Sequence, residues 1–156
     1  MPKLNPGDQA PDFELKDQEG QLVRLADFKR RKLLLYFYPK ADTPGCTKQA
    51  CSVRDSREDL SGLGVAVVAI SPDDTARQKK FDAKYGLGFP LLSDSDNVVA
   101  QAYGVWGEKS MYGKKVKGII RSSFLIDEAD RIIRAWYKIK PEETVPQAKL
   151  ALGNKG

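Results

Sequence analysis

The sequence contains no histidine among its 156 residues and only two cysteines, Cys46 and Cys51. The absence of histidine excludes Cys-His and Ser-His hydrolases, His-ligated metal centres and a histidine general base. Two thiols cannot complete a four-thiolate zinc or iron–sulfur site within one chain. The acidic pairs at residues 73–74 and 94–96 are expected to cap helices. We therefore expect no metal and no other cofactor.

The chain also lacks an apolar segment long enough to span a membrane, and its first residues contain no apolar signal core. We expect a cytoplasmic protein with no membrane partner. In a reducing compartment two cysteines are more often catalytic or redox-active than a permanent crosslink. With 41% hydrophobic and 30% charged side chains, residues 1–156 have the composition and size of one globular domain.

The net charge of +5 comes from 26 Lys and Arg against 21 Asp and Glu. It is scattered apart from clusters at residues 29–32 and 114–117, both of which look like turns. A nucleic-acid-binding module is the alternative function that such clusters can indicate, with an affinity that falls steeply with salt. The unpatterned charge favours solvated loops instead, so we expect no nucleic-acid partner.

Apolar periodicity and turn residues predict an alternation of strands and helices. A strand–helix–strand–helix half followed by a β-hairpin and a helix is typical of an α/β fold, the thioredoxin-like three-layer sandwich, with a central mixed sheet and here an N-terminal β-hairpin extension. The expected elements are a hairpin at 13–25, a strand at 33–38, a helix from 43 to about 60, a strand at 65–71, a helix at 72–85, a strand at 91–92, a helix at 96–103, a basic, glycine-bearing excursion at 104–118, a hairpin of strands at 119–127 and 131–138, and a helix at 141–152.

Cys46 stands just after a predicted buried strand, at the start of a helix that Thr43 is expected to cap. Unpaired backbone N–H groups and the positive end of the helix dipole favour a thiolate there. At about 100° per residue, Cys46 shares a face with Ala50 and Val53, whereas Cys51 lies about 140° away among charged side chains. We expect a sheltered, reactive Cys46 and a more exposed Cys51.

The residues alone leave alternatives open for the two cysteines. Cys46 could be an inert core residue, although its place at the helix start argues against this. The pair could be a structural disulfide or a thioredoxin-style redox pair, but that motif has two intervening residues where this chain has four. A phosphatase loop is excluded because Ser52 occupies the position that requires arginine.

Arg121 is the candidate to stabilise a thiolate in a chain without histidine. It stands at the start of the predicted strand at 119–127, where a charged side chain needs a partner if it is buried. The alternative, an edge-strand arginine that faces solvent, is equally compatible with the pattern.

The run from Pro39 to Cys46 resembles the active-site motif of peroxiredoxins. Residues 42–51, Asp-Thr-Pro-Gly-Cys-Thr-Lys-Gln-Ala-Cys, are similar to the Q-type branch of that family, the bacterioferritin comigratory proteins. The resemblance extends over nearly the whole chain, with further matches at residues 7–13, 70–73, 89–94 and 121–127.

The resemblance implies an atypical two-cysteine thiol peroxidase that reduces hydrogen peroxide and alkyl hydroperoxides in antioxidant defence. Cys46 would be the peroxidatic residue and Cys51 the resolving residue. They would form a redox-active Cys46–Cys51 disulfide that thioredoxin, or glutaredoxin, reduces, and the branch implies a monomer. The competing hypothesis is a general thiol–disulfide oxidoreductase of the same fold. Such an enzyme would reduce insulin and ignore peroxide.

The resemblance also assigns roles around the sulfur. Thr43 and Arg121 would stabilise charge on the departing oxygen. The N–H groups of Gly45 and Cys46 would assist them, and Pro39 would shield the sulfur from water.

One position departs from the pattern of many peroxiredoxins, which have glutamate three residues after the peroxidatic cysteine. This chain has Gln49 there. Glutamine can accept a hydrogen bond from Arg121 but contributes no charge, so the alignment of the arginine would depend on further partners.

Overall fold

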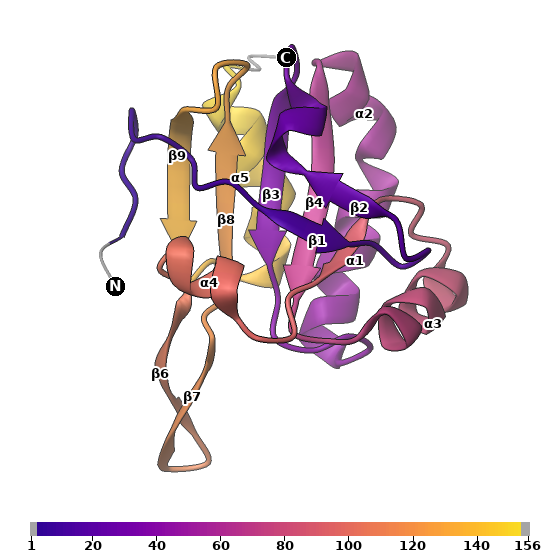
Figure 1. The fold of residues 1–156 in the computed structure, drawn as a ribbon, viewed down its shortest axis with the longest axis vertical. Coiled ribbons are helices and arrows are strands. Elements are labelled where there is room, and N and C mark those ends of the chain that lie inside the picture. The colour runs from indigo at the N-terminus through magenta and orange to yellow at the C-terminus, as the bar shows by residue number, and fades with distance from the viewer. Residues whose placement is uncertain (1–2, 154–156) are drawn as a thin grey trace.

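The computed structural model describes residues 3–153, which form a seven-stranded mixed sheet with helices on both faces (Figure 1). In spatial order the strands are β2 (Leu22–Arg24), β1 (Glu14–Lys16), β5 (Leu91–Ser93), β4 (Val65–Ser71), β3 (Lys32–Phe37), β8 (Ser122–Ile126) and β9 (Ile132–Tyr137).

Side chains of β3 alternate between the two faces of the sheet. Leu35 and Phe37 join the core on one face, and Leu34 and Tyr36 join the core on the other. β3, β4 and β5 pair in parallel, while β8, β9 and the N-terminal strands pair antiparallel. Parallel strands that are covered on both faces are apolar throughout, which explains the unbroken apolar run of β4. The N-terminal hairpin joins the edge of this sheet through β5.

Helices on both faces give the three layers that the sequence predicts. Among residues 3–153, none of these helices is both long and apolar enough to cross a membrane. One face carries α1 (Pro44–Asp55), α2 (Arg57–Gly62), α3 (Thr75–Tyr85) and α5 (Thr144–Ala151), and the other carries α4 (Val98–Ala102) and the 3-10 turn η1 (Leu25–Phe28), while η2 (Pro141–Glu143) precedes α5.

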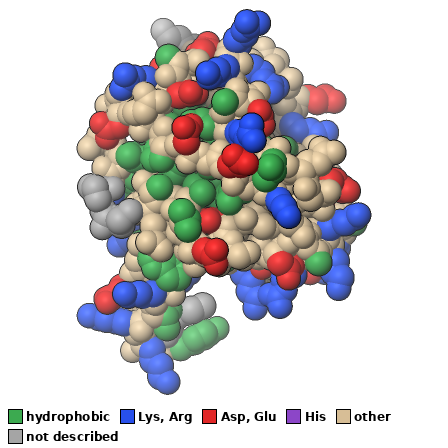
Figure 2. Space-filling model, viewed as in Figure 1, with side chains coloured by type: hydrophobic (Ala, Val, Ile, Leu, Met, Phe, Trp, Pro, Cys, Tyr) green, Lys and Arg blue, Asp and Glu red, His purple; other side chains and the backbone are tan. Residues whose placement is uncertain are grey.

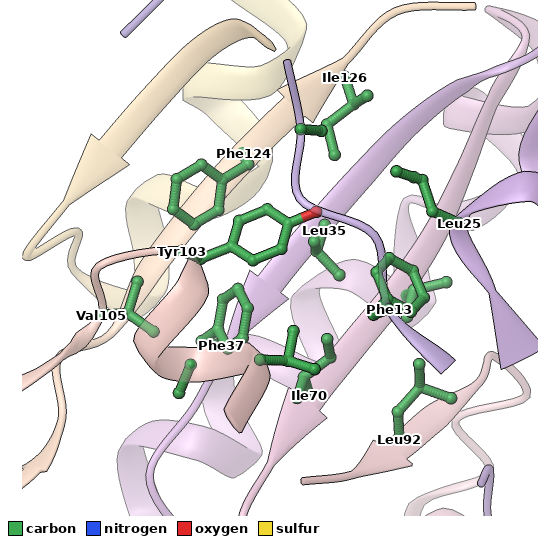
Figure 3. Packing of buried hydrophobic residues seen from close by; sticks show 14 of the residues in the cluster. Phe13, Leu25, Leu35, Phe37, Ile70, Leu92, Tyr103, Val105, Phe124 and Ile126 are labelled. Carbon is green, nitrogen blue, oxygen red and sulfur yellow. The ribbon is translucent and has the colours of Figure 1, made fainter. Parts of the chain in front are cut away.

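The core on the α4 face is built around aromatic rings (Figure 3). The Tyr103 ring packs against Phe37 and Phe124, with centroids 5.3 Å and 5.1 Å apart. Phe13 from the N-terminal segment belongs to the same core. This packing fixes β3 and β8 from one side. Cys46 packs in the core on the opposite side, where α1 covers the same strands.

The single helix predicted from residue 43 to about 60 is wrong, because the chain leaves helical geometry at Ser56. Its φ of −101° and ψ of 4° separate α1 from α2. Serine is a weak helix former, and the Ser56 N–H is shared between the carbonyls of Ser52 and Val53. The break still leaves Leu60 fully buried.

The basic excursion predicted at 104–118 has a regular structure that the sequence does not predict. It contains an antiparallel hairpin of β6 (Trp106–Met111) and β7 (Lys114–Ile119), which projects from the body of the molecule (Figure 1). Tyr112 and Gly113 form its turn, both with left-handed φ, as a two-residue hairpin turn of type I′ requires. The basic cluster at 114–117 therefore lies in a strand and not in a turn, and lysines line the hairpin (Figure 2).

The strand predicted at 119–127 is divided in the structure. Ile119 ends β7, and Arg121 lies in the connection before β8 rather than within a strand. The backbone of this connection forms hydrogen bonds that do not belong to either β-sheet. The Ile120 N–H donates to the Val105 carbonyl at 2.7 Å, and the Arg121 carbonyl accepts from the Ile139 N–H at 3.0 Å. This connection turns Arg121 toward the start of α1.

Candidate active site

Cys46 lies in the first turn of α1, where β3 has just ended. Pro44 is the first helical residue, and the first helical hydrogen bond runs from the Thr47 N–H to the Thr43 carbonyl at 2.8 Å. The N–H groups of Gly45 and Cys46 precede that bond and have no acceptor within the helix. The Cys46 side chain is only 2% exposed. A thiolate here would therefore face unpaired backbone donors in a nearly water-free site.

Cys51 lies five residues further along the same continuous helix. Cys46 is buried, whereas Cys51 is half-buried, and both are free thiols. The buried side chains of α1 include Ala50 and Val53 as well as Cys46. The helical periodicity therefore predicts the difference in exposure between the two cysteines correctly.

Arg121 contacts the sulfur directly. Its Nη2 donates to Cys46 Sγ at 3.5 Å, and its Nη1 donates to Gln49 Oε1 at 2.6 Å. Gln49 Nε2 in turn donates to Thr144 Oγ1 at 2.8 Å, and both of these side chains are completely buried. The guanidinium is thus held by α1 and, through Gln49, by the start of α5. The alternative of a solvent-facing arginine does not hold.

Gly45 allows the guanidinium to come this close. A Cβ atom at this position would lie 3.1 Å from Arg121 Nη2 and 3.6 Å from Pro141 Cγ. Either the side chain or the guanidinium would have to move if a larger residue stood there. Gly45 therefore contributes space for Arg121, in addition to the N–H group that the sequence suggests.

Thr43 occupies the N-cap position, but the expected side-chain cap is not formed. Its backbone is extended, and its hydroxyl donates to the Lys40 carbonyl at 2.8 Å instead. Short hydroxyl side chains often bond nearby backbone in this way. The hydroxyl closes the loop before α1 and contacts neither Cys46 nor Arg121 in this arrangement.

Pro39 and Arg121 both line a cavity of about 430 Å³ beside the β6–β7 hairpin. Lys109 of β6 reaches into the same cavity, and its Nζ donates to the Ile119 carbonyl at 3.0 Å. Burial and the neighbouring Arg121 guanidinium lower the pKa of Lys109, while Cys46 acts in the opposite direction. The cavity gives a small solute a route to the Arg121 side of the site.

Asp73 holds the loop that carries Pro39 and Thr43. Its Oδ2 accepts from the Ala41 N–H at 2.7 Å and from Ser71 Oγ at 2.8 Å. Asp74 caps α3, as expected, by accepting from the Arg77 N–H at 2.8 Å, but Asp73 is not a cap.

A buried chain of hydrogen bonds continues from Ser71 into the core. Gln78 Nε2 donates to Ser71 Oγ at 2.9 Å, and the Tyr38 hydroxyl donates to Gln78 Oε1. Burial raises the pKa of Tyr38 well above its ordinary value, so its hydroxyl remains a neutral donor. The residue before Pro39 and the loop after it are thus anchored to the same network.

The structure brings Cys46, Arg121 and Gln49 into one site and places Pro39 and Gly45 at its border. Sequence reasoning missed Lys109 and Thr144. Gly113 at the tip of the β6–β7 hairpin was the sequence signal that could have indicated this hairpin, and Lys109 lies on its first strand. Nothing local pointed to Thr144, which meets Gln49 only through the tertiary fold. Within residues 3–153, no group of three or more His, Cys, Asp or Glu side chains is arranged to hold a metal ion.

The family model, the related sequences and the solved structures that match this chain agree with one another. The AhpC/TSA family model matches residues 6–135. Peroxiredoxin Bcp of Escherichia coli (strain K12) is 51% identical over 132 residues, 85% of this chain and 85% of that protein. The structure of Xanthomonas campestris peroxiredoxin Q has a TM-score of 0.85 at 34% identity, covering 92% of this chain and 90% of its own.

A second solved structure concerns the alkyl peroxide reduction activity of the Xanthomonas campestris bacterioferritin comigratory protein. It has a TM-score of 0.84 at 33% identity and covers 90% of each chain. The region matched by the family model, residues 6–135, contains both cysteines, Gln49 and Arg121.

Proposed function

We propose, since this chain belongs to the AhpC/TSA family and is a peroxiredoxin of the Bcp branch, that Cys46 is its peroxidatic residue and acts on hydrogen peroxide and alkyl hydroperoxides. The observation that carries the assignment is the buried sulfur of Cys46, 3.5 Å from a guanidinium nitrogen of Arg121. No base is needed once the thiol is ionised, which suits a chain without histidine.

In the first step the Cys46 thiolate attacks one peroxide oxygen and the O–O bond breaks. The sulfur becomes a sulfenic acid, and the second oxygen leaves as alkoxide or hydroxide, which takes up a proton to give alcohol or water. Negative charge moves from sulfur to the departing oxygen. Arg121 and the N–H groups of Gly45 and Cys46 are placed to stabilise that charge, with the Thr43 hydroxyl as a further donor once it leaves Lys40.

In the second step the Cys51 thiol condenses with the sulfenic acid, so that a disulfide forms and water is released. We propose thioredoxin, or glutaredoxin, as the dithiol that reduces this disulfide. The greater exposure of Cys51 supports this order of events, because a partner thiol can reach it more easily than the buried Cys46.

One domain, a monomer and a cytoplasmic location complete the proposal. The seven-stranded sheet runs from the N-terminal hairpin to β9, with the β6–β7 hairpin as a separate two-stranded sheet, which supports one domain. The chemistry needs a reducing compartment. Among the described residues, the exposed large hydrophobic side chains are spread over separate elements, with two of them on the β6–β7 hairpin, which favours a monomer; they are Leu22, Leu63, Val98, Tyr112, Val116 and Leu150.

The test of function is peroxide-dependent NADPH oxidation with thioredoxin and thioredoxin reductase, compared with glutathione and glutaredoxin. We expect turnover with hydrogen peroxide and with an alkyl hydroperoxide. Insulin reduction is the control, since a general thiol–disulfide oxidoreductase would reduce insulin and leave peroxide unchanged. Insulin reduction without peroxide consumption would reject the peroxidase.

Gln49→Met is expected to lower the rate constant for peroxide with Cys46 by about tenfold to a hundredfold. Methionine fills a similar volume but leaves the Arg121 guanidinium and the buried Thr144 hydroxyl without their partner. Stopped-flow single-turnover measurements would report the rate. Gln49→Glu is the matched control, because it keeps the acceptor for Arg121 and should stay within about fivefold of the unaltered protein. Equal rates for Gln49→Met and the unaltered protein would mean that Gln49 does not align Arg121.

Disulfide formation is expected to unwind α1. Residues five apart in a regular helix have α-carbons about 8.6 Å apart. A disulfide generally needs about 4.4 to 6.8 Å, so Cys46 and Cys51 cannot bond in an intact helix. Amide hydrogen exchange should therefore be faster across residues 43–54 in the oxidised protein than in the reduced one. The same protection in both forms, with the disulfide confirmed by mass spectrometry, would contradict unwinding.

A further inference from the structure

Two residues at the carboxyl end of α3 hold α1 at both of its ends. Tyr85 Oη donates to Asp42 Oδ1 at 2.7 Å, and Lys84 Nζ donates to Asp42 Oδ2 at 2.9 Å. Arg54 Nη1 donates to the Tyr85 carbonyl at 2.7 Å. Asp42 stands just before α1 and Arg54 is its penultimate residue, so both cysteines lie between the two attachment points. We call these contacts the α3 clamp.

The first attachment holds Asp42 in an unfavourable backbone conformation. Asp42 has a left-handed φ of 59°, which a non-glycine residue adopts only at a cost unless its surroundings hold it. The hydrogen bonds from Lys84 and Tyr85 supply that hold, and they lower the pKa of the Asp42 carboxyl.

The other attachment satisfies the carbonyl end of α3. Tyr85 is the last residue of α3, so its carbonyl has no donor within the helix and forms part of the negative end of the helix dipole. The Arg54 guanidinium donates to this carbonyl and places a positive charge at that end. The Tyr85 ring is itself fixed by an edge-to-face contact with buried Phe81, with centroids 5.6 Å apart. The clamp is therefore anchored in the core.

We propose that Lys84 and Tyr85 are positioning residues for the peroxidase cycle, which keep α1 helical through Asp42 and Arg54 and set how often it opens to let Cys51 reach Cys46. The inference rests on the proposed function. Peroxide reacts with Cys46 in the closed helix, whereas the disulfide forms only from the opened helix. The observed rate of disulfide formation therefore scales with the small opened fraction, while the peroxide rate scales with the large closed fraction.

Loosening the clamp should separate these two rates. Tyr85→Phe removes one hydroxyl and keeps the ring on Phe81, and Arg54→Met removes the guanidinium. Each should accelerate disulfide formation by about threefold, the change expected for losing one exposed or partly buried hydrogen bond, and the double variant by about tenfold. The second-order rate constant for peroxide should stay within about twofold of the unaltered protein.

A third readout follows from competition for the sulfenic acid. A second peroxide molecule converts it to sulfinic acid, with the peroxide oxygen transferred to sulfur and water or alcohol released, unless Cys51 reacts first. The peroxide concentration that converts half of Cys46 to sulfinic acid should therefore rise by the same factor as disulfide formation. A general loss of stability would not raise the rate of disulfide formation and this peroxide concentration by the same factor while leaving the peroxide rate constant unchanged.

Matched controls test whether the clamp itself is responsible. Tyr112→Phe removes a hydroxyl from a side chain that is 98% exposed at the hairpin tip, and Arg24→Met removes the exposed Arg24–Glu14 ion pair. Both should leave all three readouts unchanged. Rapid quenching with thiol alkylation and mass spectrometry would follow the disulfide and the sulfinic acid.

Unchanged disulfide rates in Tyr85→Phe and Arg54→Met would overturn the clamp, as would parallel losses of both rates. If the unaltered protein forms no Cys46–Cys51 disulfide, the resolving role of Cys51 fails instead. Amide exchange of the reduced variants then decides the clamp separately: it predicts faster exchange across residues 44–55, and unchanged protection there would reject it.

Discussion

Replacing Cys46 with serine is expected to abolish peroxide turnover completely. A serine hydroxyl is a poor nucleophile without a base, and the chain has no histidine to supply one. The remaining thiol, Cys51, lies on the other side of α1, away from the sulfur site that Arg121 contacts. Single-turnover peroxide consumption at stoichiometric protein measures the loss, and thermal unfolding shows whether the variant is folded.

Cys51→Ser is the control for that experiment. It keeps Cys46 and Arg121 together, so it should consume one equivalent of peroxide at an unchanged rate to give the sulfenic acid, and any oxidation beyond that state should consume a further equivalent. A sulfenic-acid trapping reagent followed by mass spectrometry would identify the product. If Cys46→Ser and the unaltered protein consumed equal peroxide in one turnover, the roles of the two cysteines would have to be exchanged.

Elements with a strong local pattern could be predicted from the sequence. The bounds of β4, Val65–Ser71, match the prediction because a strand buried on both faces is apolar along most of its length, here up to Ser71 at its end. The place of Cys46 was also predictable, since a buried strand, a proline at the first helical position and a 3.6-residue period all act locally.

Features that depend on tertiary contacts could not be predicted in the same way. The β6–β7 hairpin projects from the body and has almost no apolar face, so its strands lack the alternation that identifies a half-buried strand. Arg121 was placed in a strand because the sequence around it is apolar, whereas long-range bonds to Val105 and Ile139 set its backbone.

Side-chain partners were the least predictable part of the site. Thr43 has the residue type and position of a cap, but its hydroxyl closes the preceding loop instead. Asp73 looks like a cap and holds the Ala41 N–H across 32 residues of sequence. Cap and loop bonds have similar geometry and energy, so the local course of the loop decides between them for Thr43, and the tertiary position of Ala41 decides for Asp73.

Arg121→Ala is expected to slow the reaction of Cys46 with peroxide by about a hundredfold to a thousandfold, the range typical for losing a preorganised donor to a developing negative charge. Its alkylation by iodoacetamide should slow by less than about tenfold. The reason is that both reactions need the thiolate, but only the peroxide reaction leaves a strongly basic oxygen for the guanidinium to stabilise. Stopped-flow rates with the two reagents at the same pH would give the ratio.

Two further variants separate the geometry of the guanidinium from its charge. Arg121→Lys keeps the charge but replaces the two guanidinium nitrogens that contact Cys46 and Gln49 by a single ammonium nitrogen, so its peroxide rate should fall between those of Arg121→Ala and the unaltered protein. Thr43→Val should act in the same direction with a smaller effect, because the hydroxyl must first leave the Lys40 carbonyl to reach a bound peroxide. Equal losses of peroxide and iodoacetamide reactivity in Arg121→Ala would mean that Arg121 only raises the thiolate population. The stabilisation of the departing oxygen would then have to come from the N–H groups at the start of α1.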